Sequence, residues 1–407
     1  MRAHRRLRLS FIVVLLLLFV FPLNGRAIAQ AEPVRSDIEY KFDEWIRVQV
    51  TVPQDMGVRS VQAFIQTDDE INTWPSVLLQ PDAGNVMFEY NPQEMGLRAF
   101  SNLFYWIETT LQNGEISSGP KIPFYYEDNR FEWKRRSREP FEVFWHEGDS
   151  AFGLSLLDVA QQGLTQVQTL MPLPSPDRIR LYAYADAVDM RATFRSSGRS
   201  WVGAHTDPDL GVMVVSLPPG PEQRLEMERQ IPHELMHILL YQKVGPAYVN
   251  LPAWLNEGLA SIAELYPNPD YQILLESAYE KETLLPMSTL CIQFPLDAAG
   301  AYLAYAQAAS FTRYLHEQYG SLLIDQLVRQ YATGLDCERG IEVALGTSMS
   351  QLERDWRREI LGEDPWLTAL INLAPWLLLL GAILTVPFVL VIVTLRSKPP
   401  ARPQNKR

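Results

Sequence analysis

Alternating hydrophobic and polar positions run through the chain between about residues 38 and 126. Residues 45–52 read Trp-Ile-Arg-Val-Gln-Val-Thr-Val, and similar alternation recurs at 61–65, 86–90 and 104–109. Turn sequences such as Asp82-Ala83-Gly84-Asn85 separate these runs, which is typical of short strands joined by tight connections. We therefore predict about seven strands that form a β-sandwich over residues 32–127.

A different pattern follows the charged residues 127–138, which we interpret as a linker. Residues 141–145, 179–185 and 212–216 read as strands and residues 150–171 as an amphipathic helix. After residue 216, helical periodicity dominates to residue 362. Strands followed by helices favour an α+β fold. We predict a second domain at 139–362, with a small sheet and a helical lobe, behind an immunoglobulin- or fibronectin-like sandwich.

Both ends of the chain are strongly apolar. A basic start, an apolar run from Phe11 to Leu23 and the triplet Ala27-Ile28-Ala29 predict a signal peptide at 1–29, with an uncleaved anchor as the alternative. Residues 366–395 carry no charge, and about 20 apolar residues suffice to cross a bilayer. We predict a transmembrane helix at 374–395. The basic residues that follow predict a cytoplasmic tail at 396–407.

Without these two ends, the net charge of the chain is more negative. Residues 31–395 carry 26 basic and 48 acidic residues, a net charge of −22. Such a body repels phosphate, which argues against nucleic acid as a partner. The two cysteines, Cys291 and Cys337, would lie in an extracytoplasmic compartment that favours a disulfide between them, with two buried free thiols as the alternative.

The second domain contains the sequence His233-Glu234-Leu235-Met236-His237. Positions i and i+4 share one face of a helix, so both imidazoles can reach one zinc ion while Glu234 reaches the water that it binds. Catalytic zinc needs a third protein ligand. Glu257 lies 20 positions after His237 and is our candidate, with a solvated carboxylate at a helix start as the alternative.

Together, HELMH at 233–237 and WLNEGLA at 254–260 resemble the gluzincin metallopeptidases, and especially the peptidase MA-like domain proteins. The sequence at 305–315 is similar to a helix typical of that domain, and the resemblance covers roughly residues 140–360. It implies a zincin-like fold that binds one zinc ion through His233, His237 and Glu257. It also implies that Glu234 is the general base and that the substrates are peptides or proteins.

The chain also departs from its relatives. It has no Gly-x-Met-Glu-Asn segment, with which zinc aminopeptidases grip a free amino terminus, so we expect an endopeptidase. Ser261 stands where thermolysin-like enzymes have the Asp that orients a zinc-bound histidine. Glu264 is a candidate replacement, with an ordinary carboxylate on the helix surface as the alternative.

Other residues are candidates for supporting roles. Tyr302, Tyr305 and His205 could stabilise the oxyanion of the transition state, although both tyrosines also fit the buried stripe of an Ala-rich helix. Residues 211–216 resemble the edge strand against which zincins pair extended substrates. Pro232 predicts that the zinc helix starts or kinks there.

These features predict a single-pass extracytoplasmic zinc metallopeptidase in the cell membrane, with its ectodomain outside. The short signal and basic tail favour a bacterial source, and tethering favours substrates near the membrane. One alternative is a non-catalytic cell-surface binding protein that uses the sandwich and retains a zincin scaffold. Such a scaffold has no need of a carboxylate at Glu234. A second alternative is a zinc hydrolase with a non-peptide substrate.

Overall fold

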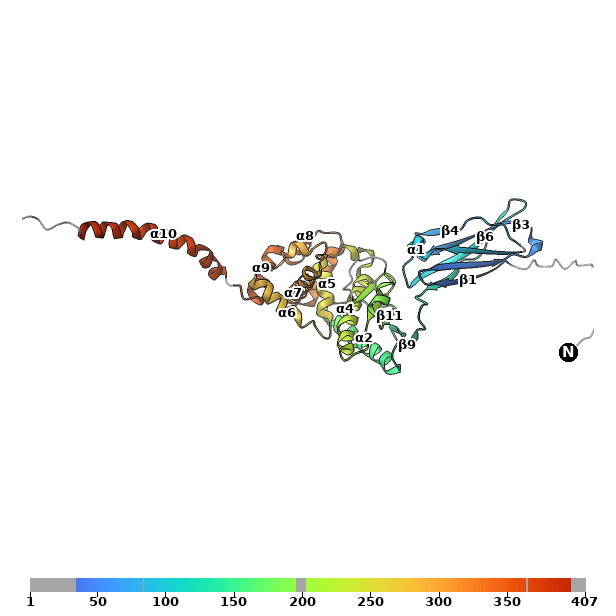
Figure 1. The fold of residues 1–407 in the computed structure, drawn as a ribbon, viewed down its shortest axis with the longest axis horizontal. Coiled ribbons are helices and arrows are strands. Elements are labelled where there is room, and N and C mark those ends of the chain that lie inside the picture. The colour runs from blue at the N-terminus through green and yellow to red at the C-terminus, as the bar shows by residue number, and fades with distance from the viewer. Residues whose placement is uncertain (1–33, 83, 195–202, 364, 397–407) are drawn as a thin grey trace, which may run out of the picture. The chain divides into compact units, whose positions relative to one another are not determined.

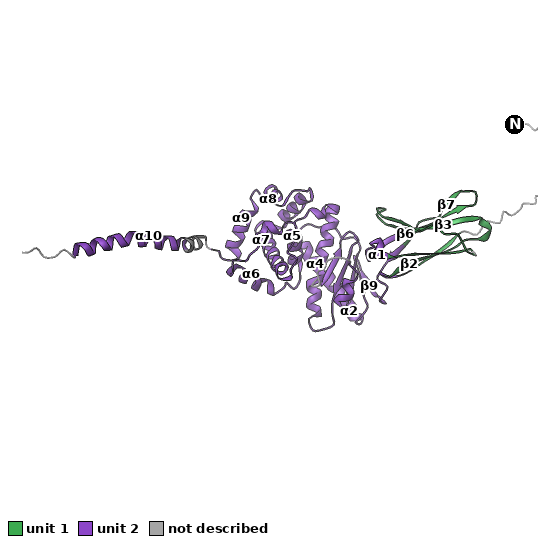
Figure 2. Cartoon of the chain, turned by 45° about the horizontal axis from the view of Figure 1, so that its top comes forward, with its two compact units in different colours: residues 1–40, 44–91, 104–123 green, residues 41–43, 92–103, 124–407 purple. Residues whose placement is uncertain are grey.

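A computed structural model describes residues 34–82, 84–194, 203–363 and 365–396. The chain divides into two compact units, which Figure 2 colours separately. The first comprises residues 1–40, 44–91 and 104–123, and the second comprises residues 41–43, 92–103 and 124–407. The expected signal peptide at 1–29 and nearly all of the expected tail at 396–407 lie outside the described residues.

The N-terminal region is built of two antiparallel sheets (Figure 1). Alternation explains them: in β2, Ile46, Val48 and Val50 are buried while the residues between them are more exposed. One sheet has the order β1-β2-β5, and the other has the order β4-β3-β6-β7 with β8 paired to β6. Their strands are β1 (Arg35–Lys41), β2 (Trp45–Thr51), β3 (Val58–Thr67), β4 (Thr73–Pro75), β5 (Asn85–Tyr90), β6 (Ser101–Leu111), β7 (Ile116–Ser118) and β8 (Ile122–Tyr126). Two short helical turns occur in this part of the sequence, η1 (Gln54–Met56) and α1 (Pro92–Met95), and α1 belongs to the second compact unit.

A five-stranded mixed sheet opens the second region, with the order β12-β13-β11-β10-β9. The central pairs β10–β11 and β11–β13 are parallel, and the outer strands β9 and β12 are antiparallel to their neighbours. The bounds are β9 (Lys134–Arg138), β10 (Phe141–Trp145), β11 (Ile179–Tyr184), β12 (Ala204–Asp207) and β13 (Val212–Ser216). The linker interpretation of residues 127–138 is therefore wrong. Charged residues on an outer strand and a fully buried Asp128 made this segment look like a solvated connection.

Helices pack on one face of this sheet and form a lobe beyond it (Figure 1). Their apolar side chains join those of β10, β11 and β13 in one continuous core, to which α3 and the described side chains of α10 do not contribute. Helix α7 is interrupted at Gly320, whose φ of 78° suits glycine. The helices are α2 (Ser150–Leu170), α3 (Ala187–Arg191), α4 (Gln223–Val244), η2 (Gly245–Asn250), α5 (Ala253–Ala263), α6 (Asp270–Glu280), η3 (Met287–Leu290), α7 (Ala298–Ala332), α8 (Cys337–Leu345), α9 (Met349–Ile360) and α10 (Pro365–Arg396).

Among the described residues, one helix is long and apolar enough to cross a membrane. It is the part of α10 from Leu373 to Arg396, which has 24 residues, a mean hydropathy of 2.8 and no buried positions. This finding rests on length and composition alone. The overall class is α+β, with N-terminal antiparallel sheets, a mainly helical second region and an exposed apolar C-terminal helix.

Candidate metal centre

Helix α4 carries His233, Glu234 and His237 on adjacent faces. The helix begins at Gln223 and runs through Pro232, so it does not start at this proline, whereas the kink expected there stays a prediction. The ring of Pro232 is buried, and a Cβ built on Gly163 of α2 would meet its Cγ at 3.0 Å. A close packing contact with α2 therefore accompanies a residue that helices usually avoid.

Helix α5 brings Glu257 to the two histidines. The Oε2 atom of Glu257 lies 3.5 Å from Nε2 of His233 and 3.7 Å from Nε2 of His237. One ligand atom from each residue fits within a mutual distance of 4.8 Å. Two imidazole nitrogens and one carboxylate oxygen at such distances are a donor set that suits zinc, with room for a further ligand. The residues present thus fit a metal ion of this kind.

A buried carboxylate fixes the ring of His233. Its Nδ1 atom lies 3.1 Å from Oε1 of Glu264, which is only 5% exposed. Glu264 is therefore not an ordinary surface carboxylate. Ser261, four positions after Glu257, is also buried and makes no such contact with His233. A carboxylate bonded to Nδ1 leaves Nε2 of His233 as the atom that faces Glu257.

Neutral groups hold His237 in the same way. Its Nδ1 atom lies 3.1 Å from the hydroxyl of Tyr248 and 3.2 Å from Oδ1 of Asn256. The amide of Asn256 also donates to the Tyr248 hydroxyl at 2.8 Å. Sequence reasoning missed both residues in this role. Asn256 precedes Glu257 inside the recognised motif, whereas nothing in the sequence marks Tyr248 of η2.

Electrostatics favour the ionised form of Glu257, the candidate third ligand. Burial alone would raise the pKa of Glu257, but the two histidines and a hydrogen bond from Tyr305 outweigh burial and lower that pKa. Burial likewise works to lower the pKa of His233. Its hydrogen bonds with Glu257 and Glu264 prevail, and the pKa lies well above the ordinary value. Glu257 is accordingly an anionic donor suited to a divalent cation.

Glu234 is 7% exposed, and its side chain reaches the sheet. Its Oε2 atom accepts a hydrogen bond from the hydroxyl of Thr206 on β12. Strand β12 lies at the edge of the described sheet, whereas β13 lies between β12 and β11. The expectation that residues 211–216 form the edge strand is therefore wrong. The hairpin partner that precedes them in the sequence takes that place.

The three candidate stabilisers lie in different surroundings. The hydroxyl of Tyr305 hydrogen-bonds to Glu257, and its ring lies 6.3 Å from that of His233. Tyr302, one turn earlier, is 43% exposed and its ring faces Tyr271 at 6.5 Å. His205 precedes Thr206 on β12 and contacts Asp207 and the ring of Phe194. Of the three, the structure brings only Tyr305 into hydrogen-bonding contact with the ligand group.

The cysteines lie beside the start of α5. Cys291 and Cys337 form a disulfide. The carbonyl oxygen of Cys291 accepts a hydrogen bond from the backbone N–H of Ala253 at 2.9 Å, and the indole of Trp254 donates to the sulfur of Cys337 at 3.3 Å. Both Ala253 and Trp254 lie in the first turn of the helix that carries Glu257. The disulfide thus braces one end of the ligand-bearing helix.

Comparison with known families agrees with this centre. The family model of the Peptidase MA superfamily matches residues 159–362, which include α4, α5 and α7. The chain belongs to this superfamily of metallopeptidases. His233, His237 and Glu257 form the cluster that an HExxH motif with a glutamate third ligand requires. No curated protein matches the chain.

Proposed function

We propose that this protein is a zinc-dependent endopeptidase of the cell membrane, with Glu234 as its general base. One observation carries the proposal: ligand atoms of His233, His237 and Glu257 converge within 4.8 Å in a Peptidase MA domain, and the buried Glu234 lies next to His233 on α4. A buried carboxylate is costly unless it is bonded or used. A non-catalytic scaffold gives no reason to keep it beside the ligands.

The chemistry is divided between the ion and the side chains. Zinc bound by the two histidines and Glu257 would supply Lewis acidity and acidify a water molecule. Glu234 accepts a proton from the attacking water and delivers it to the amine of the leaving peptide. Thr206 orients Glu234 through its hydrogen bond, so the carboxylate has a fixed direction before substrate arrives.

Tyr305 is our candidate for stabilising the negative charge that develops on the peptide carbonyl. Its hydroxyl already reaches the ligand group through Glu257. A donor aimed at a developing oxyanion contributes more in the transition state than in the ground state. Tyr302 and His205 are weaker candidates because their contacts point to other residues.

Strand β12 is the platform that we propose for an extended substrate. It has a neighbour on one side only within the described sheet, and its residue Thr206 contacts Glu234. A peptide paired with such an edge is held through its backbone, so its side chains are tolerated broadly. Binding of this kind needs no free terminus and supports internal cleavage.

The anchor belongs to the same proposal. The exposed apolar part of α10 would cross the bilayer, with the basic residues after it on the cytoplasmic side. The signal peptide at 1–29, the immunoglobulin- or fibronectin-like sandwich at 32–127 and the peptidase domain at 139–362 complete the proposed organisation. Proteins near the membrane are then the natural substrates.

The decisive experiment combines metal content with cleavage of casein by the full-length protein in detergent. We expect one zinc per chain, cleavage inside the substrate and loss of cleavage with a chelator. Glu234→Gln should retain zinc and lose turnover, whereas Glu222→Gln, at an exposed position beside the start of α4, should behave as the wild type. Cleavage that survives Glu234→Gln would refute the assigned base, and a chain that binds no zinc would refute the site.

A further inference from the structure

The segment 92–103 belongs to the second compact unit, although the sequence before and after it belongs to the first. Its residues Leu97, Ala99, Phe100 and Leu103 are at most 5% exposed. The Phe100 ring stacks on Tyr182 of β11 at 4.0 Å between centroids, and its N–H donates to the Tyr126 carbonyl oxygen at 2.7 Å. The backbone that carries Arg98 is therefore firmly anchored against the sheet of the peptidase region.

Phe100 also has an unusual backbone. Its φ of 61° lies in the left-handed region, which costs about 1 kcal/mol or more for a residue with a bulky side chain. Local strain of this kind persists where surrounding contacts hold it. Here it lets Phe100 enter the aromatic layer on the sheet while Arg98, two residues earlier, reaches a different element.

Arg98 forms ion pairs with the end of the edge strand β12 and with the turn that follows it. Its guanidinium donates to both carboxylate oxygens of Asp209, at 3.0 and 2.6 Å, and to Asp207 at 3.5 Å. Asp207 is the last residue of β12, and Asp209 lies in the turn to β13. A guanidinium that binds a carboxylate through two nitrogens fixes orientation as well as distance. The contact thus holds the end of the strand on which Thr206 contacts Glu234.

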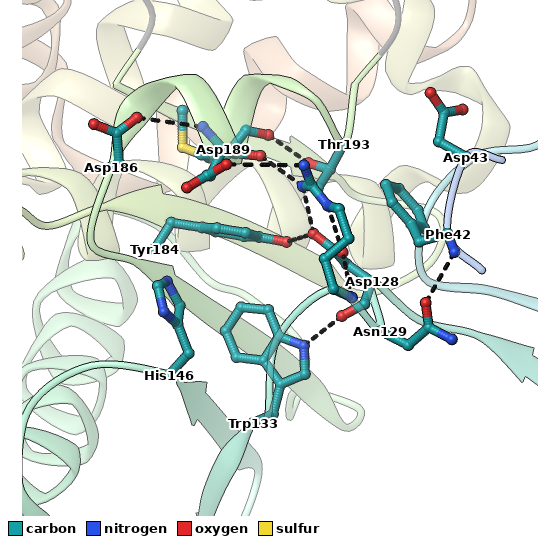
Figure 3. Close-up of polar contacts among 12 residues, drawn as sticks. Phe42, Asp43, Asp128, Asn129, Trp133, His146, Tyr184, Asp186, Asp189 and Thr193 are labelled. Carbon is teal, nitrogen blue, oxygen red and sulfur yellow. Dashed lines mark hydrogen bonds and ion pairs between the residues drawn. The ribbon is translucent and has the colours of Figure 1, made fainter.

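A second arginine holds the element before β12. Arg130 donates to the carbonyl oxygen of Asp189 in α3 at 3.0 Å and to both oxygens of the buried Asp128. Figure 3 shows this cluster, in which Asp128 also accepts a hydrogen bond from Tyr184 of β11. Arg130 therefore contacts α3, which precedes β12 in the sequence, and Arg98 contacts the turn that follows it. Neither arginine lies on a strand of the peptidase sheet.

We propose that Arg98 is a positioning residue for β12. Through Arg98, the segment 92–103 holds the backbone of this edge strand in the position in which it binds the substrate peptide. The proposal rests on the proposed function for the role of β12 in substrate binding. Arg98 does not touch the candidate metal ligands. Its effect is transmitted through Asp207 and Asp209 to the backbone of β12, and it therefore acts on binding of the peptide more than on proton transfer.

The test uses the full-length protein with Arg98→Ala, Arg98→Lys and the charge-reversed pair Arg98→Glu with Asp209→Arg. Arg47→Ala is the matched control, because it removes an exposed ion pair with Glu89 on β5, a strand of the other unit. Hydrogen exchange of residues 203–211 is measured without substrate, and KM and kcat are measured with a peptide. Zinc content is measured for each variant.

We expect faster exchange at β12 in Arg98→Ala and a KM raised about fivefold, as loss of an ion pair of this strength gives, with kcat within about twofold and zinc content unchanged. Arg98→Lys keeps the charge but loses the contact through two nitrogens, so it should recover only part of the loss, whereas the reversed pair should recover most of it. Unchanged exchange at β12 in Arg98→Ala would overturn the proposal, as would a reversed pair as impaired as Arg98→Ala. If the wild type cleaves nothing, the proposed function fails, whereas the exchange measurement still decides whether Arg98 holds β12.

Discussion

The backbone N–H of Leu265 donates to the carbonyl oxygen of Glu228 at 2.9 Å, joining the chain just after α5 to the second turn of α4. In a regular helix this carbonyl would bond the N–H of residue 232, but proline has none. Leu265 directly follows Glu264, the residue that contacts His233. Pro232 thus leaves open an acceptor that fixes the backbone beside the carboxylate of the metal centre.

Replacing this proline tests the relationship. Pro232→Ala restores a helical donor to the Glu228 carbonyl, which then competes with Leu265. We expect zinc to bind about threefold more weakly, well below the loss from removing a ligand contact itself. The unfolding midpoint should stay the same or rise, because proline is about 3 kcal/mol worse than alanine inside a helix. A chelator competition titration beside a thermal melt checks both, and unchanged zinc affinity would contradict the idea.

Glu264 itself should matter more. Glu264→Gln keeps the side chain's size but removes the charge that faces Nδ1 of His233. Loss of such an outer partner typically weakens metal binding by 10- to 100-fold, and we expect a loss in that range. Glu280→Gln, at an exposed position in the last turn of α6, is the control and should bind zinc as the wild type does. Equal affinities in the two variants would show that Glu264 does not support the ligand.

The candidate ligand set was predictable because it depends on local spacing. His233 and His237 share a helix face at any HExxH sequence. Glu257 lies in the WLNEGLA sequence, which together with HELMH resembles the peptidase MA-like domain proteins. The partners of these histidines depend on tertiary packing. Glu264 approaches His233 only because the chain beyond α5 is tied back to α4, and no periodicity in the sequence encodes that hydrogen bond.

The N-terminal sheets followed from strict alternation, as in β2. Strand order did not, since it is a long-range property. All residues of 212–216 are buried, which suits a strand whose sheet is covered on both faces but does not reveal its neighbours. The short β12 has too few residues to show a pattern. Strand β9 was hidden by its charges, because five residues with four cationic side chains look like a solvated connection.

Tyr305 and Tyr302 offer a matched pair on one helix. Tyr305→Phe removes the hydroxyl that contacts Glu257, whereas Tyr302→Phe removes one that is exposed beside Tyr271. If Tyr305 stabilises the oxyanion, its variant should lose about 100-fold in kcat while it retains zinc. Tyr302→Phe should remain within about twofold. Steady-state kinetics with a defined peptide decide, and a kcat of Tyr305→Phe near that of the wild type would remove it from the mechanism.

The disulfide should support stability and the metal centre together. Cys291 and Cys337 are 46 positions apart, and closing a loop of that size stabilises a fold by about 4 kcal/mol in the chain-entropy account. The double variant Cys291→Ser, Cys337→Ser should lose stability of that order in a urea melt. Zinc should also bind more weakly, because the Cys291 carbonyl accepts the N–H of Ala253 at the start of α5.

Treatment with a reductant is the control for the double variant Cys291→Ser, Cys337→Ser. It should lower the melting midpoint and zinc affinity of the wild type toward those of the serine variant, and leave the variant itself unchanged. Because Glu257 lies one turn beyond Ala253, loosening the start of α5 moves the carboxylate ligand relative to the two histidines on α4. A wild type that melts at a lower temperature in reductant but binds zinc as before would confine the disulfide to stability.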